Sequence, residues 1–270
     1  MGRSGPFNFT INRLTGSVGA EVEGLHVRDL TPESFGVLRQ AFHDHCVLVF
    51  RKQFLGPEEL IAFTKWWGEV YITPYVPKVE GHPAVLRLWN MTKAKTVTEV
   101  WHHDASFQPT PAAIGILAAE KLPSAGGDTM FANQYLAYEA LSDGMKRMLQ
   151  GLRALHKDGI LGKAFGIDNS KVPPESHPVV RTHPETGRKC LYVNILYTIG
   201  LEGMTQEESA PLLTYLYAHS VKPEFVYRHR WQAGDVLMWD QRCTQHYAVH
   251  DYGEEERFLL RSTVAGTRPA

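Results

Sequence analysis

The apolar run Ala112-Ala113-Ile114-Gly115-Ile116-Leu117-Ala118-Ala119 is the stretch that decides the fold class. It is far shorter than the roughly 20 residues that a membrane-spanning helix needs. A short apolar run is instead typical of a buried strand, which we expect over residues 114–119. Similar runs recur at residues 47–50, 84–89, 129–132, 190–193, 235–239 and 257–264. Many short strands predict a mainly β protein with a β-sandwich or jelly-roll core.

Helices are expected at the periphery of this core. Thr31-Pro32-Glu33 supplies an N-cap, a first-turn proline and a first-turn acid, and apolar residues follow at helical spacing. A second helix is expected over residues 57–67, with Gly68 as its stop. Thr205-Gln206-Glu207-Glu208 is a capping box that opens a third helix. Pro211 lies inside this third pattern and weighs against a start before it, because proline lacks a backbone donor.

Length, charge and cysteine usage bound the class of protein. A chain of 270 residues suits one large domain and buries enough surface to fold without disulfides. With 28 basic and 29 acidic residues, the formal charge of −1 argues against nucleic acid or a membrane surface as a partner. Cys46, Cys190 and Cys243 are odd in number and far apart, which is typical of a reduced intracellular protein. The first residues carry no signal-peptide pattern, so we expect a cytoplasmic protein.

The chain holds no obvious linker, so we expect a single domain over residues 1–270. The segment 159–178 is rich in Gly, Pro, Asn and Ser and has weak periodicity, which makes it a candidate active-site lid. Composition leaves the oligomeric state open, a homodimer or homotetramer included.

Trp101-His102-His103-Asp104 is the most informative tetrapeptide of the sequence. On a strand, His102 and Asp104 would point to one face and His103 to the other. An imidazole beside a carboxylate offers two ligands to a divalent metal, and His246, which follows a strand-like run, is the best candidate for the third. Two histidines and one carboxylate leave coordination positions open, as in non-heme Fe(II) oxygenases. Taken alone, the spacing of His102 and Asp104 is more often a core histidine beside a capping aspartate.

Two arginines follow His246 on an apolar strand-like run. Arg257 and Arg261 are four residues apart, so they would share one face of a strand. Two guanidinium groups on one face repel each other unless anions lie between them, and arginine binds a carboxylate as a two-pronged fork. An exposed strand face with arginine as solubilising charge is an equal alternative.

Taken together, these residues resemble the taurine dioxygenase family of Fe(II)- and 2-oxoglutarate-dependent oxygenases, which includes dioxygenases of taurine, alkyl sulfates and aryloxyalkanoate herbicides. The resemblance covers nearly the whole chain, from about Leu14 to about Gly266. Its motifs, besides the arginine pair, are Trp101-His102-His103-Asp104-Ala105-Ser106-Phe107, Gly126-Gly127-Asp128-Thr129 and Trp239-Asp240-Gln241-Arg242-Cys243-Thr244-Gln245-His246. The resemblance implies a double-stranded β-helix core of the jelly-roll, cupin-like type and a dioxygenase activity.

Carried over residue by residue, the resemblance implies that His102, Asp104 and His246 bind Fe(II). Arg257 would hold the distal carboxylate of 2-oxoglutarate, and Thr129 would hydrogen-bond the same cosubstrate. Arg261 and the other residues of the pocket would meet the primary substrate. O2 would then be used to convert 2-oxoglutarate to succinate and CO2 while the substrate is hydroxylated. A hydroxylated carbon that also carries oxygen, sulfur or nitrogen can collapse to a carbonyl, which cleaves that bond.

The substrate class is less closely determined. The resemblance places Thr73 and Thr98 where taurine-specific members have a histidine and an asparagine, so taurine is not favoured. Residues 191–197 and 224–231 look more like aryloxyalkanoate-type members, and we expect a small organic anion of that kind. Alkylsulfonates, alkyl sulfates, amino acids and natural products stay open, and ordinary core packing is the commoner role of such aromatic residues. The residues expected to meet the substrate are Arg261, Phe107, Tyr197, Thr73 and Tyr75.

Two other classes of function compete with this interpretation. A noncatalytic jelly-roll binding protein would have a broken metal triad or lack the cosubstrate arginine, and neither is broken here. A zinc hydrolase could use the same three ligands, but it would leave Arg257 and Thr129 without a role.

Overall fold

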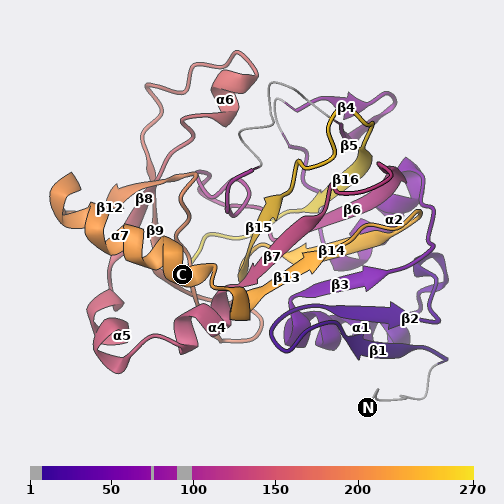
Figure 1. Cartoon of the computed structure of the whole chain (residues 1–270), viewed down its shortest axis with the longest axis horizontal. Coiled ribbons are helices and arrows are strands. Elements are labelled where there is room, and N and C mark those ends of the chain that lie inside the picture. Colours follow the sequence, from indigo (N-terminus) through magenta and orange to yellow (C-terminus); the bar gives the residue numbers. More distant parts are fainter. Residues whose placement is uncertain (1–7, 74–75, 90–98) are drawn as a thin grey trace.

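The computed structural model describes residues 8–73, 76–89 and 99–270. Tyr75 and Thr98, named above for the substrate site, lie outside the described residues. Within the described part of the chain the larger sheet has eight strands (Figure 1). Across the sheet they run Thr10–Arg13 (β1), Ala20–Glu23 (β2), Val47–Phe50 (β3), Val236–Asp240 (β14), Ile114–Lys121 (β6), Phe258–Val264 (β16), His82–Leu88 (β5) and Lys78–Val79 (β4).

A second sheet brings the candidate site together. It consists of Val226–His229 (β13), Thr129–Asn133 (β7) and Thr244–Ala248 (β15), with β7 in the centre and both pairings antiparallel. Two mainly antiparallel sheets agree with the predicted jelly-roll core.

The central strands of the larger sheet, such as β3 and β14, are buried on both faces, which explains why their sequences are continuous apolar runs. In β3, Val47 and Val49 join an apolar cluster shared with the smaller sheet. Leu48 and Phe50 alternate with them and join a second cluster, built on helices. Alternating side chains point to opposite faces of a strand, so a strand that is covered on both sides needs apolar residues throughout.

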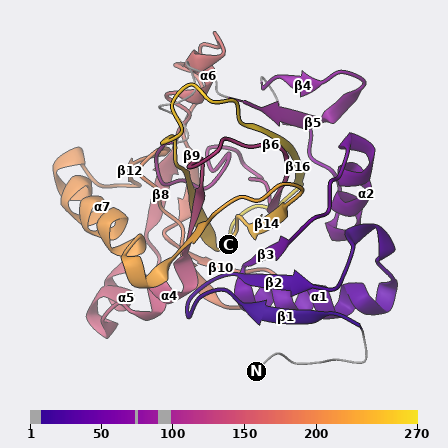
Figure 2. The same cartoon turned by 45° about the vertical axis from the view of Figure 1, so that its right-hand side comes forward.

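Two of the predicted helices cover the outer face of the larger sheet. They are Pro32–His45 (α1) and Pro57–Trp67 (α2), and their side chains form the second cluster with the sheet. Thr31 caps α1 as predicted, because its side chain accepts a hydrogen bond from the backbone N–H of Ser34. In Figures 1 and 2 this pair lies across the molecule from the other helices.

The third predicted helix, Gln206–Ser220 (α7), begins at the expected capping box between Thr205 and Glu208 and continues through Pro211. It packs over a third apolar cluster, which it shares with shorter elements; of these the sequence predicted only a strand at residues 190–193, which overlaps the observed strand Lys189–Leu191. These elements are the helices Gln134–Glu139 (α4) and Asp143–Leu149 (α5) and the strands Arg153–His156 (β8), Val180–Thr182 (β10), Lys189–Leu191 (β11) and Thr198–Leu201 (β12). The strand Glu175–Pro178 (β9) pairs with β8. Among the described residues, no helix is both long and apolar enough to cross a membrane.

The segment 159–178 has more structure than a loop. It contains a short helix, Leu161–Ala164 (α6), and ends with β9. Asp158, just before it, is buried and accepts hydrogen bonds from the backbone N–H groups of Leu161 (2.9 Å) and Gly162 (3.0 Å) and from the Asn169 side chain (2.8 Å). A single buried carboxylate therefore holds the start of the segment.

Candidate metal centre and its pocket

His102 and His246 lie side by side on paired backbone. The backbone N–H of His102 donates to the carbonyl of His246 (3.1 Å), and the reverse bond is 3.0 Å long. His246 lies within β15, whereas the sequence suggested the end of a strand. The ring of Trp239 packs 4.9 Å from that of His246, and Gly115 makes room for it, since a Cβ on Gly115 would lie 2.3 Å from the indole.

The three predicted ligands converge. Ligand atoms of His102, Asp104 and His246 all lie within 4.8 Å of one another. His102 Nε2 is 3.5 Å from Asp104 Oδ1, and His246 Nε2 is 3.6 Å from Asp104 Oδ2. Neighbouring ligands on a metal with bonds of about 2.1 Å lie about 3 Å apart, so a small contraction would close the site around an ion. His103 points elsewhere and packs 4.6 Å from the ring of Tyr192.

The hydrogen bonding of His102 suits a metal ligand. Its Nδ1 lies 2.6 Å from the carbonyl oxygen of Val100, so this nitrogen carries the proton and donates. In the neutral imidazole Nε2 then has a lone pair that faces Asp104 Oδ1. Two electron-pair donors facing each other are stabilised by a cation between them, and a backbone carbonyl behind a histidine is the usual second contact of a ligand. The residues present therefore fit a divalent ion.

Asp104 is held by two donors. Arg261 Nη2 and Gln241 Nε2 both donate to its Oδ2 at 2.5 Å, and its backbone N–H donates to Gln241 Oε1 at 3.0 Å. Burial raises the pKa of Asp104, but the charge of Arg261 and the imidazoles outweigh burial and hold that pKa well below its usual value. The carboxylate is therefore ionised. Burial and the neighbouring His102 lower the pKa of His246 to about 3, which keeps this ring neutral and able to bind a metal.

The turn after Asp104 has an uncommon backbone conformation. Ala105 has a φ of +51°, a left-handed conformation that costs a residue with a side chain roughly 1–2 kcal/mol. Such conformations gather at functional sites, where the surrounding structure imposes them. Sequence patterns gave no sign of this turn, and they did not single out Gln241 either, although it lies inside the quoted motif 239–246.

Arg257 and Thr129 lie together at a second polar position. Arg257 is buried; its Nε donates to the carbonyl of Gly127 (2.9 Å) and its Nη2 to Thr129 Oγ1 (3.4 Å). Trp231 Nε1 also donates to Thr129 Oγ1, at 3.1 Å. Burial lowers the pKa of Arg257, yet a guanidinium remains charged at any physiological pH. A buried guanidinium beside a hydroxyl is a donor set that suits a carboxylate.

A pocket of about 130 Å³ opens beside the ligands. Its walls are mostly apolar, and Arg261 is its only cationic lining residue among those described. Helix α6 of the segment 159–178 supplies Leu161 to one wall and is followed by Phe165, so this segment does border the site. The lining residues are Tyr71, Thr73, Val76, Leu86, Leu88, His102, Asp104, Ala105, Ala112, Leu161, Phe165, Tyr197, Arg261 and Thr263.

The predicted substrate residues divide around this pocket. Thr73, Tyr197 and Arg261 line it. Phe107 lines a neighbouring hollow instead and packs 4.9 Å from the ring of Tyr197, so it stands behind that side chain. Tyr197 is deeply buried, and burial raises the pKa of its phenol well above the usual value, so Tyr197 stays neutral.

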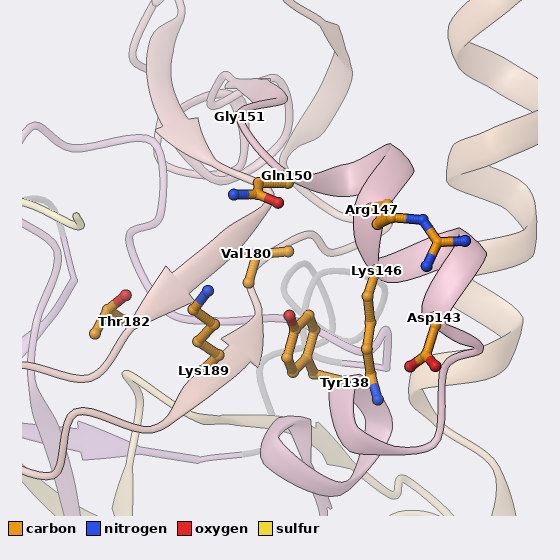
Figure 3. A pocket seen from close by; sticks show the side chains of 9 residues that line it. All are labelled: Tyr138, Asp143, Lys146, Arg147, Gln150, Gly151, Val180, Thr182 and Lys189. Atoms are coloured by element: carbon orange, nitrogen blue, oxygen red, sulfur yellow. The ribbon is translucent and has the colours of Figure 1, made fainter.

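A larger hollow, of about 330 Å³, lies away from the ligands. Figure 3 shows it between α5, which contributes Asp143, Lys146 and Arg147, and the strands β10 and β11. The amine of Lys146 donates a hydrogen bond to the backbone carbonyl of Glu139 (2.8 Å). None of the metal-ligand candidates lines this hollow, so volume alone does not locate the chemistry.

Comparison with known proteins matches this geometry. The taurine catabolism dioxygenase TauD, TfdA family matches residues 10–263. The chain is 35% identical to an alkylsulfatase of Acinetobacter baylyi over 95% of this chain and 84% of that protein. It is 33% identical to an alpha-ketoglutarate-dependent 2,4-dichlorophenoxyacetate dioxygenase of a Burkholderia species, with 88% of each chain covered.

Solved structures give the same result. A taurine dioxygenase from Burkholderia xenovorans superposes with a TM-score of 0.87 at 34% identity, over 98% of this chain and 93% of that one. The structure of AAD-2 in complex with Mn(II) and N-oxalylglycine superposes with a TM-score of 0.82 at 31% identity, over 97% of this chain and 98% of that one.

Proposed function

The chain belongs to the taurine catabolism dioxygenase TauD, TfdA family, and on this premise we propose that it oxidises a small organic anion with an apolar body, aryloxyalkanoate-like in kind. It is an oxidoreductase, an Fe(II)- and 2-oxoglutarate-dependent dioxygenase that uses O2. The observation that carries the substrate proposal is the pocket, in which apolar walls surround a single described cation, Arg261, beside the three ligand candidates.

His102, Asp104 and His246 are the proposed iron ligands. When iron, 2-oxoglutarate and O2 are bound, they supply the oxidising power that breaks a substrate C–H bond. The chain's own part is to hold two imidazoles and one ionised carboxylate with their ligand atoms within 4.8 Å of one another. These side chains would hold an ion from one side and would leave its other side open to cosubstrate and O2.

Arg257 and Thr129 are the proposed holders of 2-oxoglutarate. The buried guanidinium would bind the distal carboxylate, and the Thr129 hydroxyl, 3.4 Å from Arg257 Nη2, would add a hydrogen bond. The aromatic rings of Trp231 and Tyr252 each lie 6.0 Å from the Arg257 guanidinium carbon and help to exclude water from it.

The pocket supports a substrate with a ring or a short alkyl chain. An engineered cavity of roughly 150 Å³ holds a benzene molecule, and this pocket is close to that size. Leu86 and Leu88 of β5 and Phe165 would contact the apolar body, with Tyr197 beside it. Arg261 would meet the anionic group, a carboxylate or a sulfate ester. The sulfate ester is the second candidate because the relative at 35% identity is an alkylsulfatase.

We also propose a single domain over residues 1–270, with residues 159–178 as the lid of the pocket. Leu161 and Phe165 of this segment line the pocket, and Asp158 holds its start by four hydrogen bonds. Limited proteolysis tests the lid. Cleavage within 159–178 should slow when 2-oxoglutarate and substrate are added, and equal rates with and without them would contradict the assignment.

Cysteine burial supports a cytoplasmic location. Cys46, Cys190 and Cys243 are all free and buried, as expected of thiols that a reducing compartment keeps intact. Cell fractionation tests the location, and light scattering of the purified protein tests whether it forms a dimer or tetramer.

A substrate screen read by succinate formation tests the proposed function. Purified protein with Fe(II), 2-oxoglutarate and O2 is offered aryloxyalkanoates, sulfate esters, sulfonates and amino acids. We expect the largest stimulation with an aryloxyalkanoate. Arg261→Ala should weaken that substrate far more than 2-oxoglutarate, and equal effects on both would remove the anion-binding role from Arg261.

A further inference from the structure

Gln241 makes a two-point contact with Asp104 that the proposed chemistry has not used. Its side-chain Nε2 donates to Asp104 Oδ2 at 2.5 Å, and its Oε1 accepts the backbone N–H of Asp104 at 3.0 Å. Gln241 comes from the connection between β14 and β15, far from Asp104 in sequence, and is 1% exposed. One side chain therefore fixes both the backbone and the carboxylate of a single residue.

We propose that Gln241 is a positioning residue that orients Asp104 so that it presents Oδ1, and not both oxygens, to the metal. This inference rests on the proposed metal role of Asp104. The two oxygens differ in their contacts. Oδ2 lies 3.6 Å from His246 Nε2 but already accepts two hydrogen bonds, from Gln241 and Arg261, whereas the nearest ligand nitrogen to Oδ1 is His102 Nε2 at 3.5 Å. A carboxylate with one oxygen already engaged binds an ion through the other.

The backbone around Asp104 is irregular, so a contact from another part of the chain is needed to hold its side chain in one orientation. It follows the isolated bridge at His102 and precedes Ala105, whose φ is +51°. Gln241, by contrast, stands on anchored backbone. Its own N–H donates to the carbonyl of Ala113 (2.9 Å), and the N–H of Asp240, one residue before, donates to the carbonyl of Cys46 (2.9 Å). The two hydrogen bonds between Gln241 and Asp104, called the clamp below, therefore tie the ligand to the backbone of the larger sheet.

Arg261 cannot replace this clamp. It also donates to Asp104 Oδ2, but it lines the pocket and is the proposed partner of the substrate anion. A guanidinium that turns toward an incoming anion weakens its hold on Asp104. Gln241 does not line the pocket, so its two hydrogen bonds are the ones that persist whether or not substrate is bound.

Metal titration tests the clamp without turnover. Co(II) is titrated into the wild type, Gln241→Met, Gln245→Met and Asp104→Ala, followed by its visible absorption. Gln245 is the matched control: it is equally buried, lies four residues further on, and bonds to Gln134, Val193 and Ser220 instead of the ligands. Each methionine variant loses a buried amide, so thermal unfolding of both reports the purely structural cost.

We expect Gln241→Met to weaken Co(II) binding about 10- to 100-fold, the usual effect of losing a contact behind a metal ligand, and to change the Co(II) spectrum. Gln245→Met should bind within about twofold of the wild type with an unchanged spectrum, whatever its loss of thermal stability. If Gln241→Met does not fold, Gln241→Asn, too short to reach both groups, should show the same weakening.

Binding and spectrum equal to those of Gln245→Met would overturn the positioning role of Gln241. Wild-type Co(II) affinity in Asp104→Ala would instead show that Asp104 is not a metal ligand. Failure of the positioning role and failure of the proposed metal centre are therefore distinguishable.

Discussion

Among the residues that the structure describes, two largely buried clusters have the composition of a metal site, and only one of them is open to a metal. His102, Asp104 and His246 form the first, and His183, Asp240 and Cys243 form the second. In both, the ligand atoms lie within 4.8 Å of one another. Composition and distance therefore do not separate them.

The contacts of the two aspartates separate them. Arg242 donates to both oxygens of Asp240, Nε to Oδ1 at 2.8 Å and Nη2 to Oδ2 at 2.6 Å. His183 Nε2 donates to Oδ2 as well, at 3.0 Å, while its Nδ1 accepts from backbone N–H groups. Asp240 has no oxygen left for an ion. Asp104 has Oδ1, which faces a lone pair of His102. The second cluster is a structural ion network that holds the connection from which Gln241 and Arg242 come.

The largest effect is expected when a metal-ligand candidate of the open cluster is removed. His102→Ala should reduce O2 consumption in the presence of Fe(II), 2-oxoglutarate and substrate to the uncatalysed background, because two side chains no longer hold the ion in place. An oxygen electrode measures this, and circular dichroism checks that the variant is folded. Full turnover without His102 would mean that the first cluster is not the catalytic centre.

Removing the charge of the closed cluster should affect stability instead. Asp240→Asn removes the buried counter-charge of the Arg242 guanidinium and leaves it paired with the partly exposed Glu185, so the loss of unfolding free energy should approach the about 3–5 kcal/mol that breaking a buried ion pair costs. Urea unfolding measures the loss. Co(II) affinity of the folded protein should change less than it does in Gln241→Met. A loss of metal affinity with no loss of stability would reverse the roles assigned to the two clusters.

The same cluster predicts a pH dependence. Burial raises the pKa of Asp240, but Arg242 and the hydrogen bonds outweigh burial and hold that pKa far below its ordinary value. In the unfolded chain the carboxyl titrates near 3.9. A carboxyl whose pKa is lower in the folded state stabilises that state fully above about pH 5, and this stabilisation decreases progressively as the pH falls below about 4 toward the folded-state pKa. The stability gap between wild type and Asp240→Asn should therefore narrow in acid.

Local patterns were readable from the sequence, and contacts across the chain were not. Thr31 and Thr205 cap their helices as predicted because a cap depends on neighbours three residues away. The spacing of His102 and Asp104 is likewise local. Gln241 reaches Asp104 across the fold, so no pattern within a short window reveals it. The two clusters show the same limit, because only the position of Arg242 tells the closed one from the open one.

Arg257 and Arg242 are both buried arginines with different roles. Arg257 is proposed to bind 2-oxoglutarate, whereas Arg242 pairs with Asp240 in the closed cluster. Arg257→Ala should raise the 2-oxoglutarate concentration needed for half-maximal succinate formation by about 100-fold or more, since the lost partner of a buried carboxylate costs about 3 kcal/mol. Arg257→Lys keeps the charge but loses the two-pronged fork, so its 2-oxoglutarate requirement should lie between those of the wild type and Arg257→Ala. An unchanged requirement in Arg257→Ala would assign 2-oxoglutarate to another cation.

The smallest effect is expected at Cys243, the third member of the closed cluster. Burial raises the pKa of its thiol well above the usual value, so the thiolate that a metal needs does not form near neutral pH. Cys243→Ser should leave Co(II) affinity unchanged, and wild-type protein saturated with Co(II) should show no thiolate-to-cobalt charge-transfer band in the near ultraviolet. Such a band, lost in Cys243→Ser, would mean that an ion displaces Arg242 from Asp240. The arginine pairing would then not be what closes the second cluster, and the contrast with Asp104 would have to rest on ligand type alone.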